Sequence, residues 1–276
     1  MDAATPPISS QRASGSSFYT AMRILPQAQR DAMYEIYNFC RCVDDIADSS
    51  GPRPQRLDEL NAWRAQVSAL YQGKQGPLVA ALARPVRDFS LAQEDFLAVI
   101  DGMEMDVLED IRAPSLATLD LYCDRVASAV GRLSVRVFGL DHDNGVGLAH
   151  HLGRALQLTN ILRDLDEDAG VGRLYLPREW LDAAGISTSD PVTVLRSPGL
   201  ATVCNRLAER AREHFAQADV IMARSPRQAV KAPRIMGAVY RSILEGMVAR
   251  GWGAPRERVR VSRARIGWIL LRYAIA

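Results

Sequence analysis

The 276-residue sequence predicts an all-α protein, a single helical bundle packed around a central cavity. Three observations support this prediction. Apolar residues recur at intervals of three and four along most of the chain, which is the spacing of one helix face. No segment shows the two-residue alternation of a β-strand, and no low-complexity linker divides the chain. Two of the predicted helices also carry acidic residues four positions apart amid apolar neighbours.

Composition places the chain among ordinary globular proteins. Hydrophobic residues make up 48% of it, enough for a sizeable core, and charged residues make up 24%. The net charge of +2 is too small to indicate a nucleic-acid partner. The four cysteines lack a zinc-ligand spacing, and the chain has neither a signal peptide nor an apolar run of about 18 residues. These features predict a cytoplasmic protein.

Prolines, glycines and apolar spacing set the bounds of the predicted elements. A flexible tail over 1–15 precedes one all-α domain over 16–276. Pro26 separates the first two helices, and the run of Ser, Gly and Pro over 49–54 ends the second. Pro114 and Pro177 each stand at the start of a later helix, where a missing N–H costs little. The predicted helices cover residues 16–23, 27–48, 55–72, 92–109, 114–138, 145–168, 178–183, 199–224, 228–250 and 263–276.

The helix predicted over 27–48 carries the first acidic motif. Asp44 and Asp48 follow Tyr37 and Arg41 at intervals of three and four, so all four side chains share one helix face. Their neighbours are apolar, and unpaired polar groups in such a setting would be costly. This stripe therefore indicates a site rather than a solvated surface.

The second motif repeats the pattern over Gln157, Asn160, Asp164 and Asp168, on the helix predicted over 145–168. One acidic pair alone is usually a solvated helix face, but two such stripes can oppose each other across a cavity. Oxygen ligands at this spacing suit Mg²⁺, which takes its remaining ligands from substrate phosphates. The two motifs together predict a magnesium–diphosphate site, at which diphosphate departs and apolar walls protect the resulting allylic cation from water.

Other residues fit this chemistry less specifically. Aromatic faces can stabilise a cation, although each aromatic residue alone is more often core. The aromatic candidates are Phe18, Tyr37, Tyr122 and Tyr240. Arg41 and Arg173 carry planar guanidinium groups that match phosphate oxygens. Gly102 and the small residues over 127–131 leave two interpretations open, a close helix crossing or space for a ligand.

Five stretches resemble the squalene/phytoene synthase family, whose members join two prenyl diphosphates head to head. The stretches are Ser17-Phe18, Tyr37 to Asp48, Tyr122 to Gly131, Gln157 to Asp168 and Gly172 to Pro177. Together they span nearly the whole chain. The resemblance implies an all-α isoprenoid-synthase fold and a requirement for Mg²⁺.

The resemblance also implies roles for individual residues. The expected metal-binding residues are Asp44, Asp48, Asn160, Asp164 and Asp168. The expected substrate-binding residues are Ser17, Phe18, Tyr37, Arg41, Gln157, Asn160, Arg173 and Tyr240. Tyr122 matches the tyrosine that handles a proton after the new bond forms, and Arg41 and the four aspartates complete the expected catalytic set. Many members carry Lys or Arg immediately before the Ser-Phe pair, where this chain has Ser16.

Within the family, residues 15–23 and 40–48 are most similar to the bacterial branch that makes presqualene diphosphate from farnesyl diphosphate for hopanoids. No NADPH is expected for that step, and a separate squalene-forming enzyme is the expected downstream partner. A phytoene or dehydrosqualene synthase is the alternative, because the sequence does not give the cavity length that selects the prenyl chain. A non-catalytic helical assembly factor is an alternative of another class, and retention of all four aspartates argues against it.

The C-terminal segment supports a further prediction. Residues 250–276 contain seven arginines and a single acid, Glu257, with Trp252 and Trp268 among them. Basic residues beside aromatic and aliphatic ones suit an anionic lipid surface, which predicts peripheral contact with the inner membrane face. An equally good interpretation is that these arginines close the phosphate end of the site.

Overall fold

A computed structural model describes residues 22–108 and 111–275 of the chain. All elements named within these ranges are helices, and the only strand-type pairing there is an isolated bridge between Arg112 and Leu174. The all-α prediction is confirmed. The predicted tail over 1–15, most of the helix over 16–23, and the candidates Ser17 and Phe18 lie outside the described residues.

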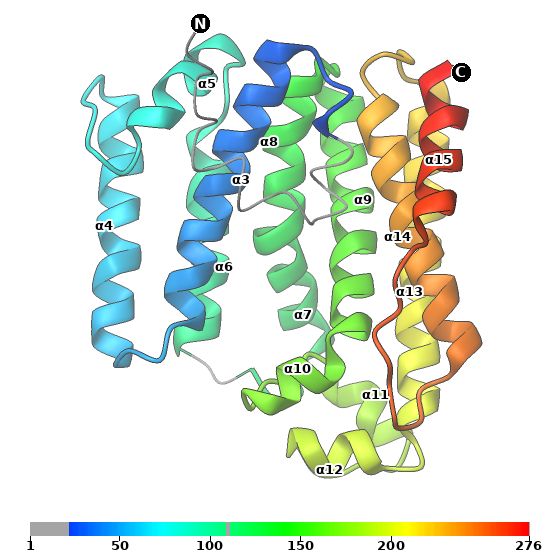
Figure 1. Ribbon diagram of the computed structural model, residues 1–276. Coiled ribbons are helices and arrows are strands. Elements are labelled where there is room, and N and C mark those ends of the chain that lie inside the picture. The colour runs from blue at the N-terminus through cyan, green and yellow to red at the C-terminus, as the bar shows by residue number, and fades with distance from the viewer. Residues whose placement is uncertain (1–21, 109–110, 276) are drawn as a thin grey trace, which may run out of the picture.

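Long helices stand side by side in the bundle (Figure 1). They are α3 (Gln27–Asp48), α4 (Arg53–Tyr71), α6 (Gln93–Leu108), α8 (Ala129–Phe138), α9 (His142–Arg163), α13 (Leu200–Arg224), α14 (Lys231–Arg250) and α15 (Arg263–Ile275). Helices α3 and α6 pack on α4 at one side and on α8 at the other, and α9 lies between α8 and the pair α13 and α14. Helix α15 covers α14 at the far edge.

Shorter elements complete the chain. They are η1 (Ala80–Leu82), α5 (Ala83–Asp88), α7 (Leu116–Cys123), η2 (Asp124–Ser128), α10 (Leu165–Gly170), α11 (Arg178–Ala183) and α12 (Pro191–Arg196). Helices α10, α11 and α12 gather at the lower end of the bundle in Figure 1. Elements η1, α5 and α12 were not predicted from the sequence, because each has six residues or fewer and shows no clear apolar repeat.

The first acidic helix is held by its apolar face. Residues of α3 at helical spacing, from Ala32 to Ala47, are buried, and Phe39 makes edge-to-face contacts with Trp63 and Phe96 at centroid distances of 5.5 and 5.1 Å. Each such aromatic pair contributes about 0.5–1.5 kcal/mol beyond its area burial. With that face fixed, the stripe that carries Asp44 and Asp48 lies on the opposite side of α3 from Phe39.

The prediction of a single helix over 145–168 is wrong, because the structure divides this segment into two helices. Helix α9 ends at Arg163, α10 begins at Leu165, and Asp164 lies between them with φ −104° and ψ 18°. The polar residues of this motif are therefore divided between two helices rather than aligned along one. The segment predicted as one helix over 114–138 also changes, because its middle part η2 is a π-helix.

The small residues at η2 mark close helix crossings. A Cβ atom on Gly102 of α6 would lie 2.6 Å from Val126 Cγ1, and one on Gly153 of α9 would lie 2.8 Å from Ser128 Cα. The wider π-turn is thus enclosed by glycines from two neighbouring helices. Val126 and Ala127 also line the large cavity described below, so both interpretations left open by the sequence apply.

None of the described helices combines the length and the apolar character needed to cross a membrane.

Candidate active site

A cavity of about 920 Å³ lies between α8, α9, α14 and the segment that precedes α15. Its volume is at the upper end of the range typical of small-molecule sites. Its walls are largely apolar and include Val130, Phe138, Leu152, Leu156, Met236 and Ile243. Polar side chains line one part of it, namely Tyr37, Arg41, Gln157, Asn160, Arg163, Tyr240 and Arg258. Five of the predicted substrate-binding residues thus share one cavity.

The first motif combines a half-buried carboxylate, that of Asp44, with the exposed carboxylates of Asp45 and Asp48. Arg41 donates to Asp44 Oδ2 and to Asp45 Oδ1, each at 2.5 Å. Burial raises the pKa of Asp44 to about 6, and the negative charge of Asp48 adds to the shift. A carboxylate in this position gains from any positive charge placed beside it.

The second motif is surrounded by arginines from two parts of the chain. Asp164 accepts from Arg163 Nε at 2.8 Å and Nη2 at 2.5 Å, and from Arg258 Nη2 at 3.0 Å. Burial raises the pKa of Asp168 to about 7, with the charge of Asp164 as the second cause. Asp164 and Asp168 therefore repel each other in the same way as the pair on α3.

Arg173 links the two motifs. Its Nη1 donates to Asp48 at 2.6 Å, while its backbone N–H donates to the carbonyl oxygen of Asp168 at 2.8 Å. Gly172, with φ +81°, provides the left-handed turn that directs the chain from α10 to Arg173. The first and second acidic motifs, 120 residues apart in sequence, thus meet at one guanidinium group and the loop that carries it.

A buried carboxylate that was not predicted as a site residue from the sequence lies between the motifs. Asp106 of α6 accepts from the Tyr122 hydroxyl at 2.9 Å and from the Tyr175 hydroxyl at 2.7 Å. The negative charge of Asp106 also contributes to the raised pKa values of both Asp44 and Asp168. The sequence did little to distinguish Asp106 from Glu104, because both acids follow Gly102 between apolar residues.

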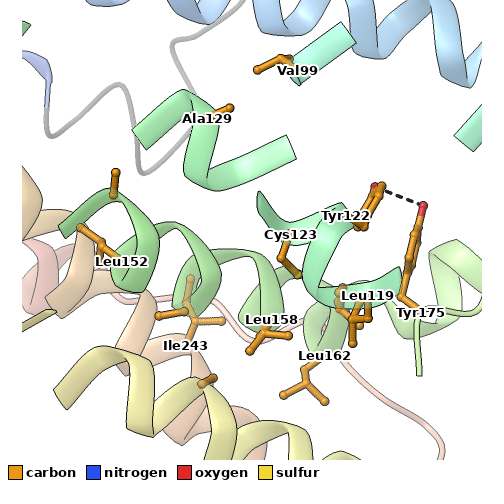
Figure 2. Packing of buried hydrophobic residues seen from close by; sticks show 14 of the residues in the cluster. Val99, Leu119, Tyr122, Cys123, Ala129, Leu152, Leu158, Leu162, Tyr175 and Ile243 are labelled. Atoms are coloured by element: carbon orange, nitrogen blue, oxygen red, sulfur yellow. Dashed lines mark hydrogen bonds between the residues drawn. The ribbon is translucent and has the colours of Figure 1, made fainter. Parts of the chain in front are cut away.

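Tyr122 is therefore a member of a buried triad. Its ring stacks on that of Tyr175 at a centroid distance of 4.9 Å, and the two hydroxyl oxygens are 3.3 Å apart (Figure 2). Burial raises the pKa of Tyr122 well above its ordinary value, and the charge of Asp106 adds to this. The phenol is thus protonated at neutral pH and donates its hydrogen bond to Asp106, so it is suited to orient or relay a proton rather than to act as a base. Tyr122 is not among the described residues that line the large cavity, although Val126, one turn later, is.

The oxygen atoms at this site fit Mg²⁺. Asn160 Oδ1 is buried and has no hydrogen-bond partner among the described residues, whereas its Nδ2 donates to Gln157 Oε1 at 3.5 Å. An unpaired buried carbonyl oxygen is costly unless it binds a ligand. Asn160 Oδ1 and the carboxylates of the two motifs are hard oxygen donors, the kind of ligand that Mg²⁺ prefers.

The C-terminal arginines lie in two different environments, one acidic and one aromatic. Arg256 pairs with Asp166 through contacts of 2.6 and 2.8 Å, and Arg258 contacts Asp164 and Glu167. These two residues close the end of the bundle that carries the second motif. Arg265 and Arg272 instead lie over the exposed ring of Trp268 on α15, at 4.9 and 5.4 Å from its centroid. Arg256 and Arg258 thus lie at the second motif, whereas contact of this segment with a membrane stays a prediction.

Comparisons with known proteins agree with this geometry. The family model described as Squalene/phytoene synthase matches residues 11–265. A presqualene diphosphate synthase of Rhodopseudomonas palustris is 61% identical over 261 residues, which cover 95% of this chain and 94% of that protein. A 15-cis-phytoene synthase of a Paracoccus species is 36% identical over 90% of this chain and 83% of its own length.

A solved structure shows the same architecture. The crystal structure of a dehydrosqualene synthase in complex with ligand superimposes with a TM-score of 0.83 at 25% sequence identity, covering 97% of this chain and 94% of that one. The match of the family model over most of the chain and the high identity to its members lead to one conclusion. The chain belongs to the squalene/phytoene synthase family.

Proposed function

We propose that the protein is a presqualene diphosphate synthase, which condenses two farnesyl diphosphates head to head and releases one diphosphate. The observation that carries the proposal is a large apolar cavity with polar residues of both motif stripes in its lining, namely Tyr37, Arg41, Gln157 and Asn160. Arginines of the same lining pair with Asp44 and Asp164, which do not line the cavity themselves. The 61% identical relative of that name supports this choice over a phytoene synthase, since the phytoene synthase of Paracoccus is only 36% identical.

Asp44, Asp48, Asn160, Asp164 and Asp168 are the residues proposed to hold Mg²⁺. Bound Mg²⁺ neutralises diphosphate oxygens and so stabilises the leaving group. The unpaired oxygen of Asn160 and the raised pKa values of Asp44 and Asp168 support this assignment, because all three groups gain from a nearby cation.

The arginines of the site bind and orient the two diphosphates. Arg41, Arg163 and Arg258 line the cavity and also contact acidic residues, so their guanidinium groups lie where prenyl chain and diphosphate meet. Arginine is suited to this because its planar fork matches phosphate oxygens. Ionisation of the donor leaves an allylic cation, and the apolar walls keep water away from it.

Ring closure follows attack of the acceptor's alkene on the donor cation. A proton is lost from the new carbon skeleton, and its electron pair closes the cyclopropane. The released diphosphate accepts this proton, while Tyr122 orients or relays it, because burial keeps the phenol protonated. Asp106 holds the Tyr122 hydroxyl in position through the 2.9 Å hydrogen bond.

The reaction stops at this stage because the diphosphate of the acceptor is retained. The product therefore requires a separate squalene-forming enzyme, which removes the second diphosphate. No NADPH takes part in the step proposed for this chain.

Product identification tests the proposal. The purified protein is incubated with farnesyl diphosphate and Mg²⁺, with and without NADPH, and separately with the twenty-carbon geranylgeranyl diphosphate. We expect presqualene diphosphate from the fifteen-carbon substrate under both conditions. Squalene formed in quantity with NADPH, or phytoene formed at a higher kcat/KM than any farnesyl product, would overturn the assignment. A helical assembly factor would form no product and would show no rise in Tm with Mg²⁺ and farnesyl diphosphate.

We also infer that the protein contacts the inner membrane face through α15. Trp268 and Leu271 are about half exposed on this helix, at 48% and 59%, and Arg265 and Arg272 flank the indole. An exposed aromatic ring among arginines suits an anionic bilayer surface, and substrate and product are both lipids.

Liposome flotation tests this contact. The wild type should float with vesicles that contain anionic lipid and should remain at the bottom with neutral vesicles. Trp268→Ala with Leu271→Ala should weaken flotation, whereas Val220→Ala, which alters an exposed apolar residue on α13, should not. Equal flotation with both vesicle types would refute the contact.

A further inference from the structure

Three of the four histidines of the chain gather on the side of α9 that faces α13. His150 and His151 are neighbours on α9, and His214 lies near the middle of α13. One ring nitrogen from each lies within 4.8 Å of the others. The diphosphate site does not use these residues. Asn160 is nine residues further along α9, about 14 Å along the helix axis, and the helical repeat directs His151 away from the cavity.

The separation of the nitrogens suits a transition-metal ion. His151 Nδ1 and His214 Nδ1 are 3.1 Å apart. Two imidazole nitrogens bound to one tetrahedral Zn²⁺ at about 2.0–2.1 Å would be roughly 3.3 Å apart. This hydrogen-bonded pair, in which His214 is buried and His151 is half-buried, is thus already close to the spacing for a shared ion. His150 is exposed, so its ring can rotate toward that ion without disturbing the packing.

The protonation state of the cluster also suits a metal. Burial lowers the pKa of His214 to about 4, and the charge of His151 is the second cause. Burial likewise lowers the pKa of His150 and of His151, with Arg154 contributing in each case. Neutral imidazole is the form that binds metals, and here it is the form present at neutral pH.

Nearby positive charge is largely compensated. Arg154 pairs with Asp120 through two contacts of 2.9 Å and with Asp124 at 3.2 Å. Arg210 is exposed, and solvent screens its charge. Because Asp120 and Asp124 neutralise Arg154, the charge near the histidine cluster does not prevent binding of a dication.

We propose that His150, His151 and His214 bind a divalent transition-metal ion of the Zn²⁺ type, with the fourth position open to water. Imidazole ligands favour Zn²⁺, Cu²⁺ and Ni²⁺ over Mg²⁺, so this site and the oxygen-rich diphosphate site select different ions. The ion joins α9 to α13 and thereby stiffens the helix that carries Asn160.

Metal titration of untagged, EDTA-treated protein tests the site. Zn²⁺ binding is measured by competition with a chromogenic chelator, in the presence of excess Mg²⁺ to occupy the oxygen ligands. We expect one Zn²⁺ per chain, and a rise in Tm with Zn²⁺. His214→Ala and His150→Ala should each weaken Zn²⁺ binding by more than about 100-fold, since loss of an outer partner alone costs 10- to 100-fold.

Two controls keep the result interpretable. His142→Ala changes the fourth histidine, at the start of the same helix, and should leave Zn²⁺ affinity and Tm unchanged. His150→Ala alters an exposed side chain, so its effect on Zn²⁺ binding does not depend on refolding of a core. Electron paramagnetic resonance of added Cu²⁺ should show coupling to nitrogen in the wild type and lose it in His214→Ala. Absence of Zn²⁺ binding, or equal binding by wild type and His150→Ala, would overturn the proposal.

Discussion

Replacement of Tyr122 by phenylalanine removes a single hydroxyl from the buried triad. That hydroxyl donates to Asp106 at 2.9 Å, while Tyr175 donates to the other oxygen of the same carboxylate at 2.7 Å. A hydrogen bond to a charged group contributes about 1.5–3 kcal/mol. At about 2–4 °C per kcal/mol for a chain of this size, Tyr122→Phe should lower Tm by about 3–12 °C. Tyr175 keeps Asp106 partly satisfied, so the fold should survive.

The effect on catalysis should separate from the effect on stability. Proton transfer by a positioned side chain contributes typically 10²- to 10⁴-fold, so kcat should fall by about 100-fold or more. The KM for farnesyl diphosphate should change little, because Tyr122 acts after the substrates are bound. Steady-state kinetics with product identification, measured well below the lowered Tm, give both values.

Two variants serve as controls for Tyr122→Phe. Tyr71→Phe deletes a hydroxyl that donates to the Leu91 carbonyl at 2.7 Å, far from the motifs, and should leave kcat unchanged. Tyr175→Phe deletes the other hydrogen bond to Asp106 and should lower Tm to a similar extent. A folded Tyr122→Phe with the wild-type kcat, or one whose loss lies in KM alone, would refute the proton-handling role.

The remaining predictions concern the metal site. Single Asp→Asn substitutions of the proposed ligands should each lower kcat by roughly 100-fold or more, the scale of groups that stabilise developing charge, whereas exposed Asp88→Asn should not. The ligands are Asp44, Asp48, Asp164 and Asp168. Chelation with EDTA should abolish product formation, and added Mg²⁺ should restore it. The pKa values of about 6 for Asp44 and about 7 for Asp168 lie above their ordinary value of 3.8. The Mg²⁺-free folded state therefore binds more protons than the unfolded state between about pH 4 and 7, so its free energy of unfolding should fall as pH rises through this window. Denaturant unfolding across that range should show less of this slope in Asp168→Asn.

Local periodicity explains what the sequence predicted well. The bounds of α3 were predicted correctly because Pro26 and the polar breakers over 49–54 flank a regular apolar repeat, and those of α11 because Pro177 marks its start. The stripe from Tyr37 to Asp48 depends only on the pitch of one helix. Its counterpart on α9 was correct as far as Asn160 for the same reason.

Tertiary contacts explain what the sequence did not predict. Nothing in the run over 157–168 breaks a helix, yet the chain departs from helical geometry at Asp164. That residue is held by Arg163 beside it and by Arg258, 94 positions away. Asp106 was missed for a similar reason, since its partner Tyr175 is 69 residues distant. Pairings of this kind follow from how the helices pack, and the sequence pattern of a single helix does not reveal them.

The arginines of the site connect its metal-binding part with its substrate-binding part. Arg41, Arg163 and Arg258 line the cavity, and they also donate to Asp44 or Asp164. Each guanidinium group therefore lies within reach of both a proposed metal-binding carboxylate and the space for substrate. An arginine in such a position limits the repulsion between the carboxylates and can share its donors with an incoming diphosphate. Loss of one arginine is thus expected to change metal affinity and substrate affinity together, although the arginine itself is not a metal ligand.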